Sequence, residues 1–131
     1  MFHKDPFLDL LFKFFVNDIF LFVNKCDLYN YADDNTLSKS DNTLQTVIES
    51  LEEDSTSLMS WFAFNKMQAN PDTFQAIAID NKTHKQNIVF DHNGNKINCD
   101  HEVKLLGITI DFKLDFNKHI SKICKKAARQ L

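Results

Sequence analysis

Two adjacent carboxylates, Asp33 and Asp34, lie in a polar segment between two short strand-like runs. Acidic side chains at the tip of a hairpin can hold divalent metal ions, which activate a nucleophile and neutralise a leaving phosphate. This is the chemistry of nucleotidyl transfer. A second interpretation stays open, because Asp and Asn are also ordinary turn residues whose side chains bond their own backbone.

A β-hairpin is predicted to carry this pair. Its arms are Cys26 to Tyr31 and Asn35 to Ser38. Successive side chains of a strand point to opposite faces, so Leu28 lies on the face opposite to Tyr29 and Tyr31.

A long amphipathic helix should follow the hairpin. Asp41 is its predicted N-cap, and the helix runs to about Lys66. The residues expected on its core face are Leu44, Val47, Ile48, Leu51, Leu58 and Phe62. Its acidic residues are expected to project mostly to solvent: Glu49, Glu52, Glu53 and Asp54.

Further strands complete the predicted pattern. Phe74 to Ile79 alternates as a strand, and Ile88 to Phe90 pairs with Lys96 to Cys99 around Asn93-Gly94, a dipeptide that favours a type I′ turn. Val103 to Asp111 supplies the last strands. The predicted fold class is therefore α+β.

The last part of the chain is basic. Residues 101–131 carry a net charge of +4, so the preceding hundred residues sum to −7. On a helix starting near Asp115, one face is apolar, with Ile120, Ile123, Cys124, Ala127 and Leu131. The other carries Lys118, Lys122, Lys125, Lys126 and Arg129. These cations are candidates for binding nucleic-acid phosphates, and a solvated helix face is the alternative.

Several segments resemble the motifs of one protein family, and they occur in the same order as in that family. Tyr31-Ala32-Asp33-Asp34 resembles the aspartate-pair motif of reverse transcriptases. The stretches that follow resemble the family's next helix, loop and strand, primer-grip hairpin and thumb-entry helix: Trp61 to Met67, Met67 to Phe74, Val103 to Asp111, and Phe116 to Leu131. The resemblance is to the enzymes of non-LTR retrotransposons of the jockey and chicken-repeat type, and it extends from about Leu10 onward.

This resemblance implies a domain organisation and a set of partners. Residues 1–111 would be a partial polymerase palm of antiparallel strands with packed helices, and residues 112–131 would begin the thumb helix. The primer-grip-like residues would be Leu106, Gly107 and Ile108. The intact enzyme would use an RNA template, a DNA primer and deoxynucleoside triphosphates.

The resemblance also implies roles for the tip residues. Asp33 would bind the catalytic Mg²⁺ or Mn²⁺, with Asp34 beside it as a supporting carboxylate. Tyr31 and Ala32 would face the primer terminus or the incoming nucleotide.

Two departures from the family predict that this chain alone does not synthesise DNA. The family's palm has a further metal-binding aspartate on an upstream strand, followed by a glycine-containing loop, and the residues before Tyr31 cannot contain both. Leu10 to Ile19 resembles the second half of the helix after that loop, but Leu8-Asp9 stands where the family has Gly-Pro. Thr73 replaces a lysine near the triphosphate, and a threonine cannot serve as that acid at neutral pH.

We therefore expect a truncated palm that binds metal weakly. The alternative is a non-catalytic nucleic-acid-binding or small structural α+β domain derived from a retrotransposon. The absence of a neighbouring strand would leave an exposed sheet edge, which favours self-association.

Two further patterns bear on location. The Phe-rich segment from Phe7 to Val23 has charged or polar residues at every turn, and it predicts an amphipathic helix that needs a partner surface rather than a signal peptide or membrane span. The three cysteines, Cys26, Cys99 and Cys124, form no C-x-x-C pair. An intracellular protein, nuclear or cytoplasmic, is the expectation.

Overall fold

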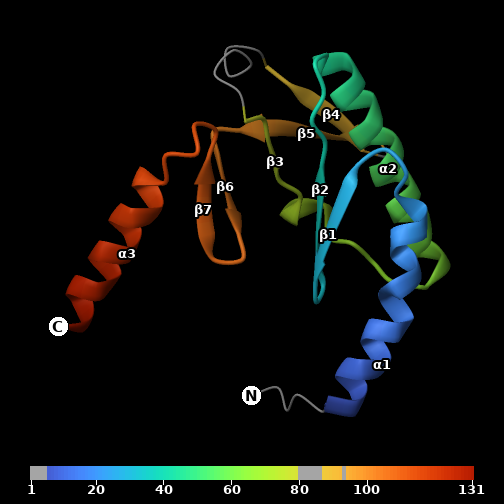
Figure 1. Ribbon diagram of the computed structural model, residues 1–131, viewed down its shortest axis with the longest axis horizontal. Helices are drawn as coiled ribbons and strands as arrows, with labels where there is room; N and C mark the ends of the chain where they lie inside the picture. Colours follow the sequence, from blue (N-terminus) through green and yellow to red (C-terminus); the bar gives the residue numbers. More distant parts are fainter. Residues whose placement is uncertain (1–5, 80–86, 93) are drawn as a thin grey trace. The chain divides into compact units, whose positions relative to one another are not determined.

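The computed structural model describes residues 6–79, 87–92 and 94–131, and the chain divides into two compact units, Met1–Ala69 and Asn70–Leu131 (Figure 1). Helices and mostly antiparallel strands occur in both units, so the predicted α+β class is confirmed.

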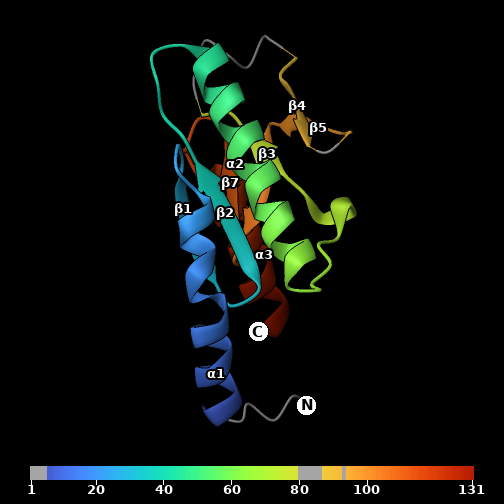
Figure 2. The same ribbon diagram turned by 90° about the vertical axis from the view of Figure 1, so that its right-hand side faces the viewer.

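The first unit is a β-hairpin with helices packed on one of its faces. Its elements are α1 (Pro6–Val16), η1 (Asn17–Phe22, a 3-10 helix), β1 (Asp27–Tyr31), β2 (Asp34–Ser38) and α2 (Leu44–Phe64). Figure 2 shows α2 running beside the hairpin, where it contacts β2. Both arms of the predicted hairpin are confirmed to within one residue.

Trp61 is the centre of this unit's core. Only 1% of its surface is exposed, and it packs with Val16, Ile19 and Leu58. Its indole N–H donates to Oδ1 of Asp18 at 3.1 Å, which satisfies the one polar group of the ring. Partly buried apolar side chains surround this cluster: Phe12, Val23, Leu28, Leu37, Phe62 and Met67.

The segment predicted as one amphipathic helix is two elements. The α-helix tightens into a 3-10 helix at Asn17, and this turn brings Ile19 into the core and Asp18 to the Trp61 indole. Much of the apolar surface of α1 and η1 remains exposed, at Leu10, Leu11, Phe14, Phe15, Phe20, Leu21 and Phe22. Such a surface is typical of a helix with a further partner.

The predicted N-cap of α2 is wrong by two residues. Thr43 occupies the N-cap position, and within the described residues its side chain makes no capping bond. Asp41 instead accepts the backbone N–H of Thr43 at 3.3 Å, which is an Asx turn leading into the helix.

The second unit combines a small mixed sheet, a hairpin and a helix. Its elements are η2 (Pro71–Thr73), β3 (Ala76–Ile77), β4 (Val89–His92), β5 (Asn95–Asp100), β6 (Glu102–Leu105), β7 (Ile108–Asp111) and α3 (Asn117–Gln130). The strand order of the mixed sheet is β3-β5-β4, with β3 parallel and β4 antiparallel to β5. β6 and β7 form a separate antiparallel pair.

One of the two strand predictions for this unit needs correction. The strand predicted over Phe74 to Ile79 shrinks to two residues, because β3 pairs only with Cys99 and Asp100 at the end of β5. The predicted hairpin between β4 and β5 is present, and Gly94 has a φ of +81°. Its turn type includes residue 93 and lies outside the described residues.

Candidate functional site

The predicted metal-binding pair lies at the tip of the β1–β2 hairpin. Tyr31 pairs with Asp34 in the last rung of the ladder, which leaves Ala32 and Asp33 as the two-residue loop. Ala32 has a φ of 54° and Asp33 is not in the positive-φ region, the pattern of a type II′ turn. Glycine is the usual residue there, so Ala32 holds a strained backbone.

Asn30 stabilises this strained tip. Its side-chain amide donates to the carbonyl oxygen of Ala32 at 3.3 Å and to Oδ1 of Asn35 at 2.7 Å. Asn30 and Asn35 are also directly opposite each other in the ladder. The two amides therefore tie both strands together one step below the turn.

The hairpin has an inner and an outer face. Leu28 and Leu37 form one cross-strand pair and pack against the Trp61 core. Tyr29 and Tyr31 alternate with Leu28 and are 62% and 68% exposed. Asp34, opposite Tyr31, is exposed as well, so the predicted site residues Tyr31, Ala32, Asp33 and Asp34 are brought together at one accessible end.

Asp33 and Asp34 are the two residues at this tip whose side chains could ligate a divalent ion. Mg²⁺ is usually bound through one or two protein carboxylates, substrate phosphates and water. In the described ranges, no group of three or more His, Cys, Asp or Glu side chains is arranged to hold a metal. Asp33 and Asp34 would thus supply at most two ligands of such a site.

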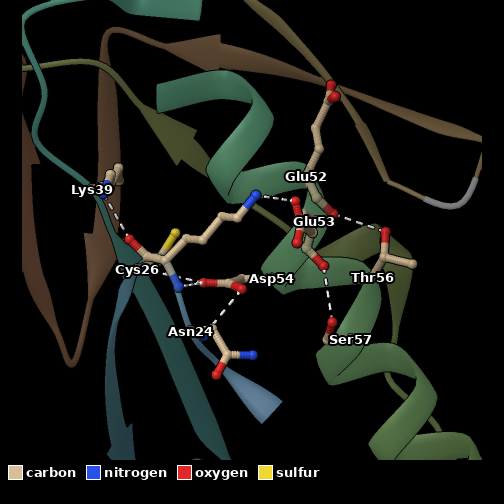
Figure 3. Close-up of polar contacts among 9 residues, drawn as sticks. Asn24, Cys26, Lys39, Glu52, Glu53, Asp54, Thr56 and Ser57 are labelled. Carbon is tan, nitrogen blue, oxygen red and sulfur yellow. Dashed lines mark hydrogen bonds and ion pairs between the residues drawn. The ribbon is translucent and has the colours of Figure 1, made fainter. Parts of the chain in front are cut away.

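A buried carboxylate that was predicted to face solvent binds the backbone just before β1. Asp54 of α2 is only 1% exposed and accepts three successive backbone N–H groups (Figure 3). Oδ1 accepts from Asn24 at 3.2 Å, and Oδ2 accepts from Lys25 at 2.8 Å and Cys26 at 2.7 Å. The prediction for Asp54 was wrong because these N–H groups replace water around the carboxylate.

The electrostatics of Asp54 follow from this geometry. Burial acts to raise the pKa of the Asp54 carboxyl, but the backbone N–H groups outweigh it and the pKa is lowered. The carboxylate is therefore ionised at neutral pH.

Neighbouring contacts reinforce the same loop. Lys25 forms an ion pair with Glu53, and Lys39 of the segment after β2 donates to the carbonyl oxygen of Lys25 at 2.8 Å. Burial and a hydrogen bond with Asp54 raise the pKa of the Cys26 thiol to about 12. Cys26 is consequently a packing residue, since the thiolate is the reactive form.

The primer-grip-like residues form the tip of the β6–β7 hairpin. Leu106 and Gly107 are its two loop residues, with φ of 49° and 82°, and positive φ at both central positions is what a type I′ turn requires. Leu106 is 54% and Ile108 is 45% exposed. The hairpin thus presents apolar side chains to solvent at its end.

Gln75 fastens this hairpin to the start of β3. Its side-chain amide donates to the carbonyl oxygen of Lys104 at 3.3 Å, and its Oε1 accepts the Lys104 N–H at 3.1 Å. The side chain therefore bonds β6 as a neighbouring backbone strand would. This contact was not predicted from the sequence.

A second buried carboxylate shapes the loop before α3. Asp111, 9% exposed, accepts the backbone N–H groups of Lys113 at 3.0 Å, Asp115 at 3.3 Å and Phe116 at 2.9 Å. Burial acts to raise the pKa of the Asp111 carboxyl, but the backbone N–H groups outweigh burial, so the pKa is lowered. The helix begins at Asn117, after Phe116 in a left-handed conformation with a φ of 59°.

The basic helix contacts its own unit through part of its cationic face. Lys118 pairs with Glu102 at 2.7 Å, and Lys122 donates to Oγ1 of Thr109 at 3.2 Å. Between them, Nδ1 of His119 accepts the backbone N–H of Thr109 at 3.1 Å. Two of the five predicted nucleic-acid-binding residues are thus already engaged with β6 and β7.

The rest of α3 is open. Lys125, Lys126 and Arg129 are exposed, and so are Ile120 and Ile123 on the apolar face, at 54% and 53%. The predicted separation into basic and apolar faces matches the helix. The apolar face, however, is directed away from the unit's own strands.

Signals for the missed residues differ in strength. Asp54 lies three residues after Leu51 and four before Leu58, so its spacing placed it on the core face. Asp111 ends a strand and precedes a short loop, a common setting for side-chain bonds to the backbone. Gln75 left no comparable signal.

Comparison of the chain with protein-family models, curated proteins and solved structures found no match. Among the described residues, no helix has the length and apolar character needed to cross a membrane.

Proposed function

We propose that this chain is the palm and thumb-entry part of an RNA-directed DNA polymerase of the non-LTR retrotransposon type. The observation that supports this is the hairpin tip: two adjacent exposed carboxylates beside an exposed tyrosine. The packing of Leu28 and Leu37 against the Trp61 cluster and the hydrogen bonds to Asp54 fix the position of this hairpin within its unit.

Each part would contribute one task. Asp33 and Asp34 would hold a divalent ion, which stabilises the charge that develops on the transferred phosphate. The Tyr31 ring would lie against the nucleotide. The tip formed by Leu106, Gly107 and Ile108 would touch the primer.

The chain alone should not extend a primer. In the proposed enzyme the third metal-binding carboxylate is supplied by another strand, outside these residues. Thr73, at the position of the family's lysine, donates its hydroxyl to the carbonyl oxygen of Asn70 at 2.8 Å. A neutral hydroxyl engaged in this way does not replace an ammonium group as the acid for pyrophosphate.

Metal binding at the tip tests the proposal directly. Amide NMR spectra would be recorded with increasing Mn²⁺, whose paramagnetism broadens nearby signals. We expect broadening centred on Ala32 to Asp34. The broadening should disappear in the double variant Asp33→Asn/Asp34→Asn. It should remain in Asp27→Asn, at the other end of the hairpin. Broadening centred elsewhere, or unchanged in the double variant, would refute the proposal.

A second candidate function is metal-independent nucleic-acid binding by α3. The supporting observation is the exposed group Lys125, Lys126 and Arg129, which extends the cationic face beyond the contacts with Glu102 and Thr109. Changing the three to Gln should weaken binding of an RNA–DNA duplex and reduce its salt dependence, by roughly 0.9 in log–log slope for each phosphate that is no longer neutralised. Lys66→Gln, in the turn after α2, is the control for loss of a lysine outside α3.

Binding that persists in EDTA and disappears in the triple α3 variant would favour this second function. Binding that is equally weakened by Lys66→Gln would show only a general charge effect.

We also propose self-association through the sheet edge of the first unit. Within the described residues, β1 and β2 pair only with each other, so each has an open edge. A concentration-independent monomer in analytical ultracentrifugation would contradict this.

A further inference from the structure

The outer face of the β1–β2 hairpin carries two exposed aromatic side chains. Tyr29 and Tyr31 are two positions apart on β1, and both are more than half exposed. In the described part of the chain, no hydrogen bond or ring contact engages either side chain. Two exposed tyrosines on one strand face are an unused aromatic surface.

The strand spacing of the two tyrosines leaves room for one nucleobase between their rings. Two residues of an antiparallel strand span about 6.8 Å. Stacked bases lie about 3.4 Å apart, so one planar base between two rings needs about twice that distance. Side chains of a strand stand roughly perpendicular to the sheet, which places both rings on the same side.

The packing of the inner face keeps both tyrosine rings out of the core. Leu28, between them in sequence, packs with Leu37 against the Trp61 cluster. A register slip that buried the tyrosines would expose both leucines. The ladder from Asp27 to Tyr31 therefore holds Tyr29 and Tyr31 outward.

We propose that Tyr29 and Tyr31 form a slot for one base of a nucleotide whose phosphates are bound through a divalent cation at Asp33 and Asp34. This inference rests on the proposed function and deepens it, because it assigns Tyr29 as a substrate-binding residue. Stacking is tolerant of base identity, so the ligand class is a nucleoside phosphate of any base.

Charge explains why the cation is required. The tip carries Asp33 and Asp34, and Asp27 lies at the far end of the same strand pair. These carboxylates repel phosphates in the absence of a metal ion. A base without phosphates avoids this repulsion but gains only the stacking contact. The slot should therefore prefer a nucleotide with Mg²⁺ to a free nucleoside.

The chain is well suited to a direct test, since it contains two tyrosines. With 3-fluorotyrosine incorporated, ¹⁹F NMR gives one signal for each. The probes are dATP with Mg²⁺, inorganic triphosphate with Mg²⁺, and deoxyadenosine alone. We expect dATP to shift both signals through the ring current of the base, with a much smaller shift from triphosphate.

Variants separate stacking from general effects. Tyr29→Ala should weaken dATP binding roughly tenfold and reduce the shift of the Tyr31 signal. Tyr29→Phe should retain the affinity, because it keeps the ring. Phe64→Ala, which removes an 85% exposed aromatic side chain at the end of α2, should leave binding unchanged.

The outcomes distinguish this inference from the proposed function. Equal shifts with dATP and triphosphate, or unchanged affinity in Tyr29→Ala, would overturn the slot even if Mn²⁺ broadens the tip. A different result would be shifts of both tyrosine signals with deoxyadenosine and no Mn²⁺ broadening at Asp33 and Asp34. This result would refute the polymerase proposal and the metal dependence of the slot, and would leave a slot for a nucleoside.

Discussion

Asp54 in the first unit and Asp111 in the second make the same kind of contact over different distances. Each is a buried carboxylate that accepts three backbone N–H groups. The partners of Asp54 precede it by 28 to 30 residues, whereas those of Asp111 follow it by two to five. The first joins two distant segments, and the second shapes a local loop.

The difference bears on the two elements predicted to be functional. Asp54 connects α2 to the residues just before β1, so it helps to set where the hairpin of Asp33 and Asp34 begins. Asp111 connects the end of β7 to the residues just before α3, so it sets where the basic helix begins. A defect in the first should spread through its unit, and a defect in the second should stay local.

The largest effect is expected for Asp54→Ala. Three buried N–H groups would lose their acceptor, and we expect the free energy of unfolding of the first unit to fall by about 3 kcal/mol. Denaturant titration followed by fluorescence of Trp61, the chain's single tryptophan, would measure this. Glu53→Gln, at the exposed neighbouring carboxylate, is the control, and an equal effect of both changes would contradict the comparison.

The two units should lose stability over different pH ranges as the solution is acidified. The lowered pKa of Asp54 means that the unfolded chain binds its proton first, so this contribution is present above pH 3.8 and is lost as the pH falls below it. Burial lowers the pKa of His92, so the second unit should already lose stability below pH 6.5. Protonation of Asp54 should lower the stability of the first unit less than Asp54→Ala does, because a protonated carboxyl keeps an acceptor oxygen.

Trp61 fluorescence reports the first window, and amide exchange of β4 and β5 reports the second. His92→Phe should remove the decline in stability of the second unit that begins below pH 6.5. If stability of the first unit declined over the same range in parallel, the assignment of these windows would be wrong.

Asp111→Ala should act only on its own loop. We expect faster amide hydrogen exchange at Lys113, Asp115, Phe116 and the first turn of α3, because these N–H groups lose their acceptor. The Trp61 unfolding midpoint should not change. Asp72→Ala, at an exposed position of the same unit, is the control, and a change in exchange spread evenly over both units would argue against a local role.

The smallest effect is expected for Lys25→Met. This change removes the ion pair with Glu53, but the side chains of both residues are about half exposed, and solvent screens such pairs. The backbone N–H of Lys25 still bonds Asp54. A Trp61 midpoint shift approaching that of Asp54→Ala would show that the ion pair, and not the buried carboxylate, holds the loop.

Local patterns predicted the elements well where chemistry and periodicity agreed. The arms around Asp33 and Asp34, the long helix after them and the basic helix near the end were all anticipated within a few residues. Gly107 also marks a hairpin turn by its own preference for positive φ. These features depend on residues close together in sequence.

Other features were mispredicted or missed because their partners are distant. Phe74 to Ile79 has the alternation of a full strand, but a strand is only as long as its neighbour allows. Asp54 has the composition of a solvated residue, and its burial depends on a loop almost thirty residues earlier. Gln75 acts through Lys104, also far along the chain.

The sequence by itself determined the α+β class, the positions of the hairpins and helices, and the types of side chain at the tip. Periodicity and turn preferences are local free energies, so they can be evaluated residue by residue. Only the tertiary structure decided that Asp54 is buried, that Tyr29 and Tyr31 face outward together, and that part of the cationic face of α3 contacts β6 and β7. Those outcomes depend on which distant groups replace water, and that is settled only when the chain folds.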